Sequence, residues 1–146
     1  MDRSPRPPGA AVLAALAGAA LLVVSPFLVW GKVDILSGTI SQTGIDAGAG
    51  WVHLAVGVGV AALAGAWLAG APARVVQVGW LVLALGIGAL TFYELTRVHD
   101  CAFFVEEVEQ CVASPSYGPG LFVALVGAGL TVVAAVAALL RPGSAR

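Results

Sequence analysis

The chain has 146 residues, of which 60% are hydrophobic and only 10% charged, and its formal net charge is −1. A soluble domain carries charge on roughly a quarter of its residues, so this composition excludes an ordinary soluble domain and predicts a membrane protein. The net charge near zero also excludes the basic surface with which proteins bind nucleic acid.

Four apolar runs are each long enough to cross a bilayer, which takes about 20 helical residues. They cover residues 10–30, 51–70, 75–95 and 120–140. Only helices or closed barrels satisfy the backbone in lipid, and unbroken runs of this length indicate helices. We therefore expect an all-α membrane protein, a single four-transmembrane-helix bundle over residues 1–146. Two longer segments, 31–50 and 97–119, are expected to be loops.

The basic residues predict the orientation of the four spans. Lys32 and Arg97 fall on the side of the two long loops, and five arginines fall on the side of the chain ends: Arg3, Arg6, Arg74, Arg141 and Arg146. By the positive-inside rule both termini lie in the cytoplasm and both long loops face outward. Aromatic residues, which gather at membrane interfaces, fit this division. Trp30, Trp51, Tyr93 and Tyr117 are expected at the outer interface, and Trp67 and Trp80 at the inner one.

Glycine pairs recur along the chain at a constant offset of 70 positions. The pairs at Gly48 and Gly57, each of the form G-x-G, match those at Gly118 and Gly127. This offset predicts a tandem duplication of a helical hairpin, with parallel repeats related by an axis along the membrane normal. A chain this rich in glycine and alanine also gives such matches by chance.

Small residues also form a stripe on one face of the second span, at Gly57, Ala61, Gly65 and Ala69, and another on the first, at Ala10, Ala14 and Gly18. Gly127 of the fourth span is likewise expected to pack against another helix. Helices in lipid are held together by close backbone approach, which small residues permit. Two alternatives follow: the stripe packs inside the bundle, or it docks a partner subunit.

Ionisable side chains are absent from the middle of every span, where transporters and proton relays carry them. His53, Glu94 and Arg97 lie within about a turn of the outer interface and form a candidate cluster. This cluster is either a solvated group of interfacial side chains or a site for a small molecule or quinone headgroup. The sequence has no G-x-S-x-G, H-E-x-x-H or P-loop pattern. We therefore expect no catalytic residues, no metal and no cofactor.

The second long loop contains both cysteines of the chain, Cys101 and Cys111. On the outer side of a bacterial membrane disulfides persist, which favours a bond between them. Ten residues of straight helix rise about 15 Å, whereas bridged Cα atoms lie about 4.4–6.8 Å apart. The bridged segment must therefore fold back. In a symmetric hairpin Cys101 faces Cys111 and Phe104 faces Val108.

Three acidic residues lie between these cysteines, Glu106, Glu107 and Glu109. We expect them to form a solvated rim, which is a candidate docking surface. A four-helix thiol oxidase would also need a C-x-x-C pair beside a quinone, and the chain has none.

Two segments give the chain a resemblance to small four-helix membrane proteins of actinobacterial type. The first loop is polar and passes through Ser37-Gly38 and residues 46–50 into the second span, and the fourth span opens with Tyr117-Gly118-Pro119-Gly120-Leu121. Some proteins of this type resemble accessory subunits of envelope or respiratory assemblies, and they imply no catalytic residue here. Claudin-type proteins place their cysteine pair in the first loop, and this chain departs from them.

The sequence thus predicts a non-catalytic protein of the bacterial cytoplasmic membrane, an accessory or scaffolding subunit of a larger complex. Its expected partners are the lipid bilayer and other membrane subunits or itself. Two alternatives stay open: a small oligomeric transporter or channel, and a quinone-linked redox or lipid-modifying enzyme.

Overall fold

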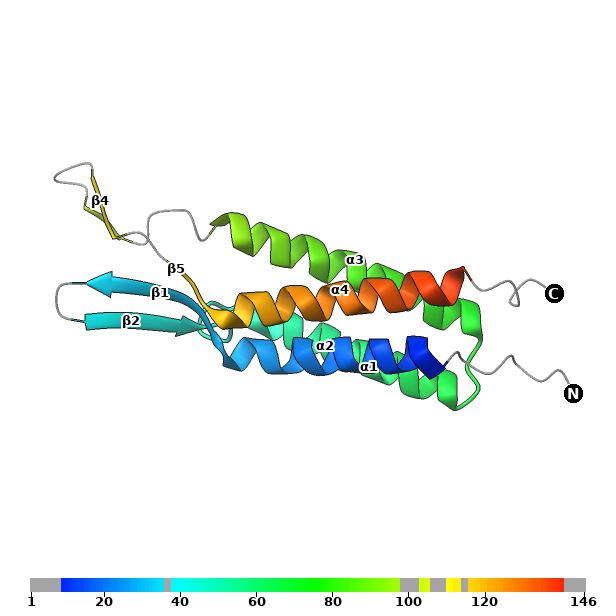
Figure 1. Cartoon of the computed structure of the whole chain (residues 1–146). Helices are drawn as coiled ribbons and strands as arrows, with labels where there is room; N and C mark the ends of the chain where they lie inside the picture. Colours follow the sequence, from blue (N-terminus) through cyan, green and yellow to red (C-terminus); the bar gives the residue numbers. More distant parts are fainter. Residues whose placement is uncertain (1–8, 36–37, 98–102, 106–109, 114–115, 141–146) are drawn as a thin grey trace, which may run out of the picture.

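The computed structural model describes residues 9–35, 38–97, 103–105, 110–113 and 116–140 (Figure 1). It contains four long helices: α1 (Gly9–Val24), α2 (Gly50–Leu68), α3 (Ala73–Arg97) and α4 (Pro119–Leu139). A short 3-10 turn, η1 (Ser25–Phe27), continues α1. All four helices are long and apolar enough to cross a membrane. The four predicted spans are confirmed, and the structure is compatible with a multi-pass membrane protein.

The four helices form a bundle in which each helix contacts two neighbours. α1 packs on α2 and α4, and α3 packs on α2 and α4. α1 begins and α4 ends at the same end of the bundle as the link between α2 and α3, while the strands extend from the opposite end (Figure 1). The assignment of the former end to the cytoplasm stays a prediction.

Two small antiparallel sheets form in the segments that the sequence predicted to be loops, so the prediction of a purely all-α protein is wrong. One sheet has the order β2-β1-β5, formed by β1 (Val29–Ile35), β2 (Gly38–Thr43) and β5 (Ser116–Tyr117). A second pair joins β3 (Phe103–Val105) to β4 (Gln110–Ala113). Val and Ile recur in β1, but such short strands become stable only through pairing with others. The partner β5 lies far away in the sequence.

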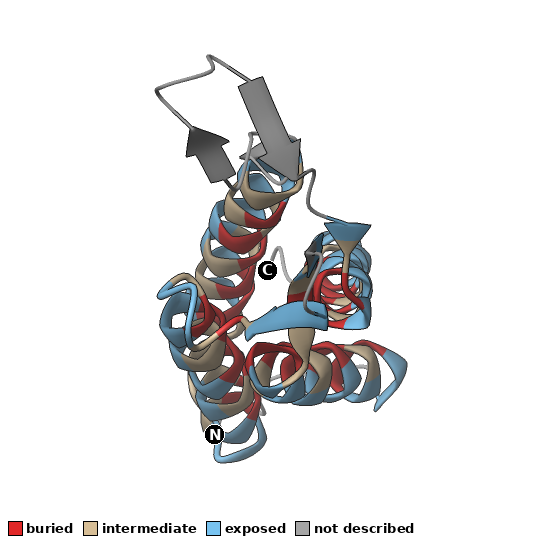
Figure 2. Ribbon diagram, turned by 90° about the vertical axis from the view of Figure 1, so that its left-hand side faces the viewer, coloured by how far each residue is buried: buried red, intermediate tan, exposed pale blue. Residues whose placement is uncertain are grey.

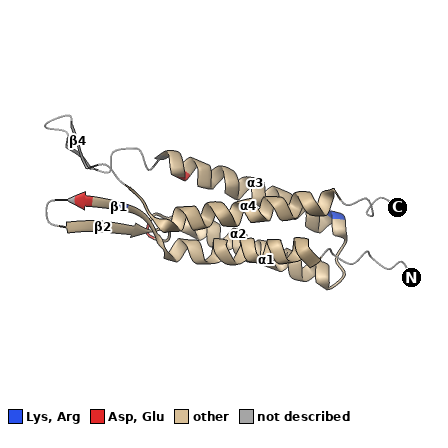
Figure 3. Ribbon diagram, viewed as in Figure 1, with Lys and Arg blue, Asp and Glu red and all other residues tan. Residues whose placement is uncertain are grey.

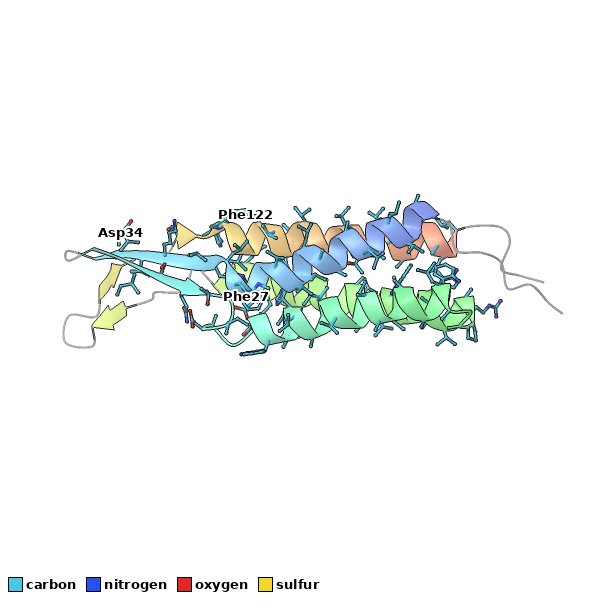
Figure 4. The ribbon with its side chains drawn as sticks, turned by 90° about the horizontal axis from the view of Figure 1, so that it is seen from below. Phe27, Asp34 and Phe122 are labelled. Atoms are coloured by element: carbon cyan, nitrogen blue, oxygen red, sulfur yellow. The ribbon has the colours of Figure 1, made fainter. Side chains whose placement is uncertain are left out.

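Buried residues on α2 and α3 recur at intervals of three and four, so each helix turns one stripe toward its neighbours (Figure 2). On α2 the stripe runs through Gly57, Val60, Ala64 and Trp67. The opposite faces are also apolar: Val75 and Val82 on α3 are each 63% exposed. Near the sheet, Phe27 and Phe122 project outward from the helices (Figure 4). An apolar exterior around a packed interior suits a lipid environment.

The stripe of small residues divides between the interior and the surface. A Cβ on Gly57 would meet the Ala19 carbonyl oxygen of α1 at 2.9 Å, and one on Gly127 would meet the Gly18 carbonyl oxygen at 3.0 Å. Ala61 is half-buried, whereas Gly65 is exposed with nothing within 4 Å of an added Cβ. Gly57 and Gly127 thus allow internal backbone contact, and Gly65 does not. The tandem duplication stays a prediction.

Candidate functional site

The sheet is joined to the bundle through Trp30, which is only 4% exposed. Its indole Nε1–H donates to the Ser25 carbonyl oxygen at 2.7 Å. A Cβ added to Gly44 or to Gly120 would collide with the indole ring, so both glycines leave the space that the ring occupies. The Trp30 ring therefore faces the interior of the sheet end of the bundle, and its predicted place at the outer membrane interface stays a prediction. The ring fills a pocket made by glycines on two other segments.

His53 of α2 packs beside Trp30 and is fully buried. The two rings meet edge to face, with centroids 4.8 Å apart. His53 Nε2 lies 2.9 Å from Thr91 Oγ1 on α3, and Nδ1 lies 3.1 Å from the Ala49 carbonyl oxygen. A carbonyl oxygen only accepts hydrogen bonds, so Nδ1 is the donor in that contact. His53 therefore joins α2 to α3 directly beneath the sheet.

The predicted cluster of His53, Glu94 and Arg97 is placed differently. Both ring nitrogens of His53 are engaged by Thr91 and Ala49, so neither pairs with Glu94. Glu94 is half-buried, and the side chain of Arg97 lies outside the described residues. The solvated-cluster interpretation is wrong for His53, because a fully buried ring has no contact with solvent.

The start of α4 is bound to β1 through the backbone. The Gly118 N–H donates to the Trp30 carbonyl oxygen at 2.7 Å. A Cβ on Gly118 would collide with the Val29 carbonyl oxygen, so glycine permits this approach. The Tyr117 hydroxyl donates to the Leu95 carbonyl oxygen at 3.0 Å and so reaches α3. The sheet is therefore fixed to the ends of several helices.

A turn at Asp46 closes the base of β2. Asp46 Oδ2 accepts hydrogen bonds from the Thr43 hydroxyl at 2.6 Å and from the Thr43 N–H at 3.1 Å. These two hydrogen bonds, the hydroxyl one first, lower the pKa of the Asp46 carboxyl below its ordinary value. The ionised carboxylate thus holds the point where β2 turns toward α2.

The opposite end of the bundle is closed by Trp67 and Trp80, whose ring centroids lie 5.4 Å apart. Both are buried, so their rings face the interior of the bundle. Their place at the inner membrane interface stays a prediction. Trp80 Nε1 donates to the Val60 carbonyl oxygen at 3.3 Å, and Gln77 Nε2 to the Ala138 carbonyl oxygen at 3.0 Å. Trp67 Nε1 has no hydrogen-bond partner within the described part of the chain.

The predicted hairpin of the second loop is confirmed in outline, because β3 and β4 pair antiparallel. Its register is wrong: Phe104 pairs with Cys111 and not with Val108. Backbone pairing, which the symmetric arrangement of cysteines ignored, sets this register. Cys101 lies outside the described residues, as do the acidic residues of the predicted rim, Glu106, Glu107 and Glu109. The disulfide and the rim stay predictions.

The described residues contain no group of three or more His, Cys, Asp or Glu side chains that could hold a metal ion. No protein-family model matches the chain, and no curated protein matches it significantly.

Proposed function

We propose that the chain is a non-catalytic integral membrane protein that holds a small sheet in a fixed position and presents it to a partner protein. In this proposal it is an accessory or scaffolding subunit of an envelope or respiratory complex in the bacterial cytoplasmic membrane. The observation that carries the proposal is the attachment at Trp30, which fixes an exposed hairpin to the helix bundle.

The polar groups of the bundle support a structural role. His53, Gln77, Thr91 and Thr131 are all buried, and each is hydrogen-bonded to a neighbouring backbone or side-chain atom. The His53–Thr91 contact joins α2 to α3 and the Gln77 hydrogen bond joins α3 to α4, as buried polar groups between membrane helices do, whereas Thr131 bonds within α4. The β1–β2 hairpin has the opposite character, since β2 is exposed along nearly its whole length.

The distribution of charge supports the proposed orientation. Charged side chains in the described part of the chain lie at the two ends of the bundle and not between them (Figure 3). Arg74 lies at the end opposite the sheet, while Lys32, Asp34, Asp46 and Glu94 lie at the sheet end. The positive-inside rule counts only Lys and Arg, and four further arginines stand in the sequence before α1 and after α4: Arg3, Arg6, Arg141 and Arg146. Together with Arg74 they favour a cytoplasmic end at Arg74 and an external sheet.

Purification in mild detergent from the native organism tests the proposal. We expect one or more partner proteins in stoichiometric amounts with the wild-type chain. The matched comparison is Trp30→Ala, which releases the sheet, against Trp51→Ala, which removes an exposed indole of α2. Loss of the partner with Trp30→Ala alone supports the proposal. A wild-type chain that purifies without any partner, and conducts ions in liposomes, would instead favour the channel alternative.

A further inference from the structure

β2 forms one edge of the three-stranded sheet, in the order β2-β1-β5. Its residues from Gly38 to Gln42 are all exposed. An edge strand has a row of N–H and C=O groups without partners, to which another strand can bond. The hydrogen bonds of the neighbouring strand show which groups these are.

The carbonyl groups of β1 show which residues of β2 direct their backbone groups toward β1 and which direct them away from it. The Trp30 carbonyl oxygen accepts from the Gly118 N–H, and the Lys32 carbonyl oxygen accepts from the Ser116 hydroxyl at 3.3 Å. Both carbonyls therefore point toward β5 and away from β2. Ser41 is paired opposite Lys32, and in an antiparallel ladder such a pair does not exchange hydrogen bonds. The N–H and C=O of Ser41 consequently point outward from the edge.

The same alternation applies to Thr39 and Thr43, two residues before and after Ser41. At Thr43 the chain itself supplies the partners: the N–H donates to the Asp46 carboxylate, and the carbonyl oxygen accepts from the Ala47 N–H at 3.1 Å. This confirms the outward direction of Thr43. Comparable hydrogen bonds are absent at Thr39 and Ser41 within the described part of the chain. Thr39 and Ser41 are therefore the residues of β2 whose backbone groups are open to another strand.

Natural edge strands are usually blocked by lysine, proline or a bulge. β2 contains neither a charged residue nor a proline, and the irregularity of its ladder lies between Val29 and Gly31, near the bundle. Ile40 is 48% exposed on one face of the strand. On the other face the Thr39 hydroxyl donates to Asp34 at 2.6 Å, so the nearest carboxylate is held on its own sheet.

We propose that β2 binds an extended, uncharged segment of a different protein as an added strand, through the backbone of Thr39 and Ser41. This inference rests on the proposed scaffolding function and names its contact surface. Main-chain pairing would supply the affinity, and an apolar side chain beside Ile40 would supply selectivity.

The direction of the strands argues against a second copy of this chain as the partner. β1 and β2 run along the helix axes (Figure 1). Antiparallel pairing of β2 between two copies would invert one bundle relative to the other, which one membrane does not allow. Parallel pairing of the two copies would need a two-fold axis along the strands. Each residue of β2 would then lie beside the same residue of the other copy, which is outside the register in which parallel strands form hydrogen bonds.

Residue-resolved hydrogen exchange tests the pairing. We compare the full chain in native membranes with the same chain purified into lipid nanodiscs. The amides of Thr39 and Ser41 should exchange at least about tenfold more slowly in native membranes. The amides of Ile40 and Gln42, which point toward β1, should exchange equally in both samples and serve as the internal control. Equal rates for Thr39 and Ser41 in the two samples would overturn the proposal.

Two substitutions complete the test. Ser41→Pro removes one outward N–H, and Ser41→Val keeps it; we expect loss of the co-purifying partner with the first and retention with the second. Ile40→Lys, which leaves the backbone unchanged, should also weaken co-purification. If Ser41→Pro and Ile40→Lys both keep the partner, the edge contact is wrong while the scaffolding function stands. If the wild type has no partner, both are wrong. Protection that persists in nanodiscs holding two copies would identify a second copy as the partner and contradict the assignment to a different protein.

Discussion

The two ends of the helix bundle each bury a large indole ring, but they do so differently. At the sheet end Trp30 has its N–H bonded to Ser25 and its ring beside glycines and His53. At the other end the Trp67 N–H has no partner among the described residues, and its ring packs on Trp80. A buried donor without a partner costs stability. The ring at the sheet end is thus the one whose contacts are more fully satisfied, in keeping with our proposal that this end positions a binding surface.

The largest effect on the difference between the two ends is expected from Gly120→Val at the sheet end. The added side chain would occupy the space of the Trp30 ring and force it out. We expect destabilisation by about 3 kcal/mol, the upper part of the usual range for overpacking. Unfolding in mixed detergent micelles measures it. Gly129→Val on the same helix is the control, because an added Cβ there meets nothing within 4 Å. Equal stability of both variants would contradict the close fit.

His53→Leu tests whether the polar contact beneath the sheet holds α2 to α3. The substitution removes the hydrogen bonds to Thr91 and to the Ala49 carbonyl oxygen. We expect a loss of about 1–2 kcal/mol, in the range measured for hydrogen bonds between membrane helices. A double-mutant cycle with Thr91→Val isolates the pair. The same cycle with the exposed Thr96→Val should show no coupling; coupling of equal size there would refute the assignment.

A matched pair of substitutions compares the two indoles directly. Trp30→Phe and Trp67→Phe remove the same atoms, but only the first breaks a hydrogen bond. We expect Trp30→Phe to be more destabilising by about 1 kcal/mol, the usual net value of one such bond. Equal losses of stability would show that the Trp67 N–H is satisfied in the membrane, for instance by a water molecule.

The smallest effect is expected from acidification at the base of β2. The folded chain lowers the pKa of Asp46, so its carboxylate stabilises the turn above the ordinary value of 3.8. That contribution is lost as the pH falls through the lower folded value. Exchange of the Thr43 amide should accelerate over this window. Asp46→Asn should remove the pH dependence; an unchanged acid response in that variant would contradict the assignment.

The helices could be predicted from the sequence because a bilayer imposes one length and one composition on every span. The sheet could not, because its pairing joins Lys32 to Ser116, and these residues lie 84 positions apart. No local pattern in the two long loops indicates that pairing. The predicted register of the second hairpin failed for another reason, because it was taken from the spacing of the cysteines and not from the backbone pairing of β3 with β4.

The candidate site was predictable in part. His53 was noticed because it is ionisable, whereas its partner Thr91 carries no charge and was overlooked. The rule that places tryptophans at membrane interfaces gave no indication that Trp30, Trp67 and Trp80 are buried inside the bundle. Gly44 and Gly120 were the available signal for Trp30, since glycines beside a large aromatic residue allow its burial. Their distance from Trp30 in the sequence concealed that relation.

The hydrogen bond from the Gly118 N–H to the Trp30 carbonyl oxygen has a mechanical consequence. It ties the first residue before α4 to the strand that follows α1, so both helices share one attachment to the sheet. β2 also continues through the backbone into α2, so a pull on the sheet would act directly on α1, α2 and α4. Among the described contacts it would reach α3 through side chains such as Tyr117 and His53. Force applied to the sheet would therefore tilt these three helices together against α3.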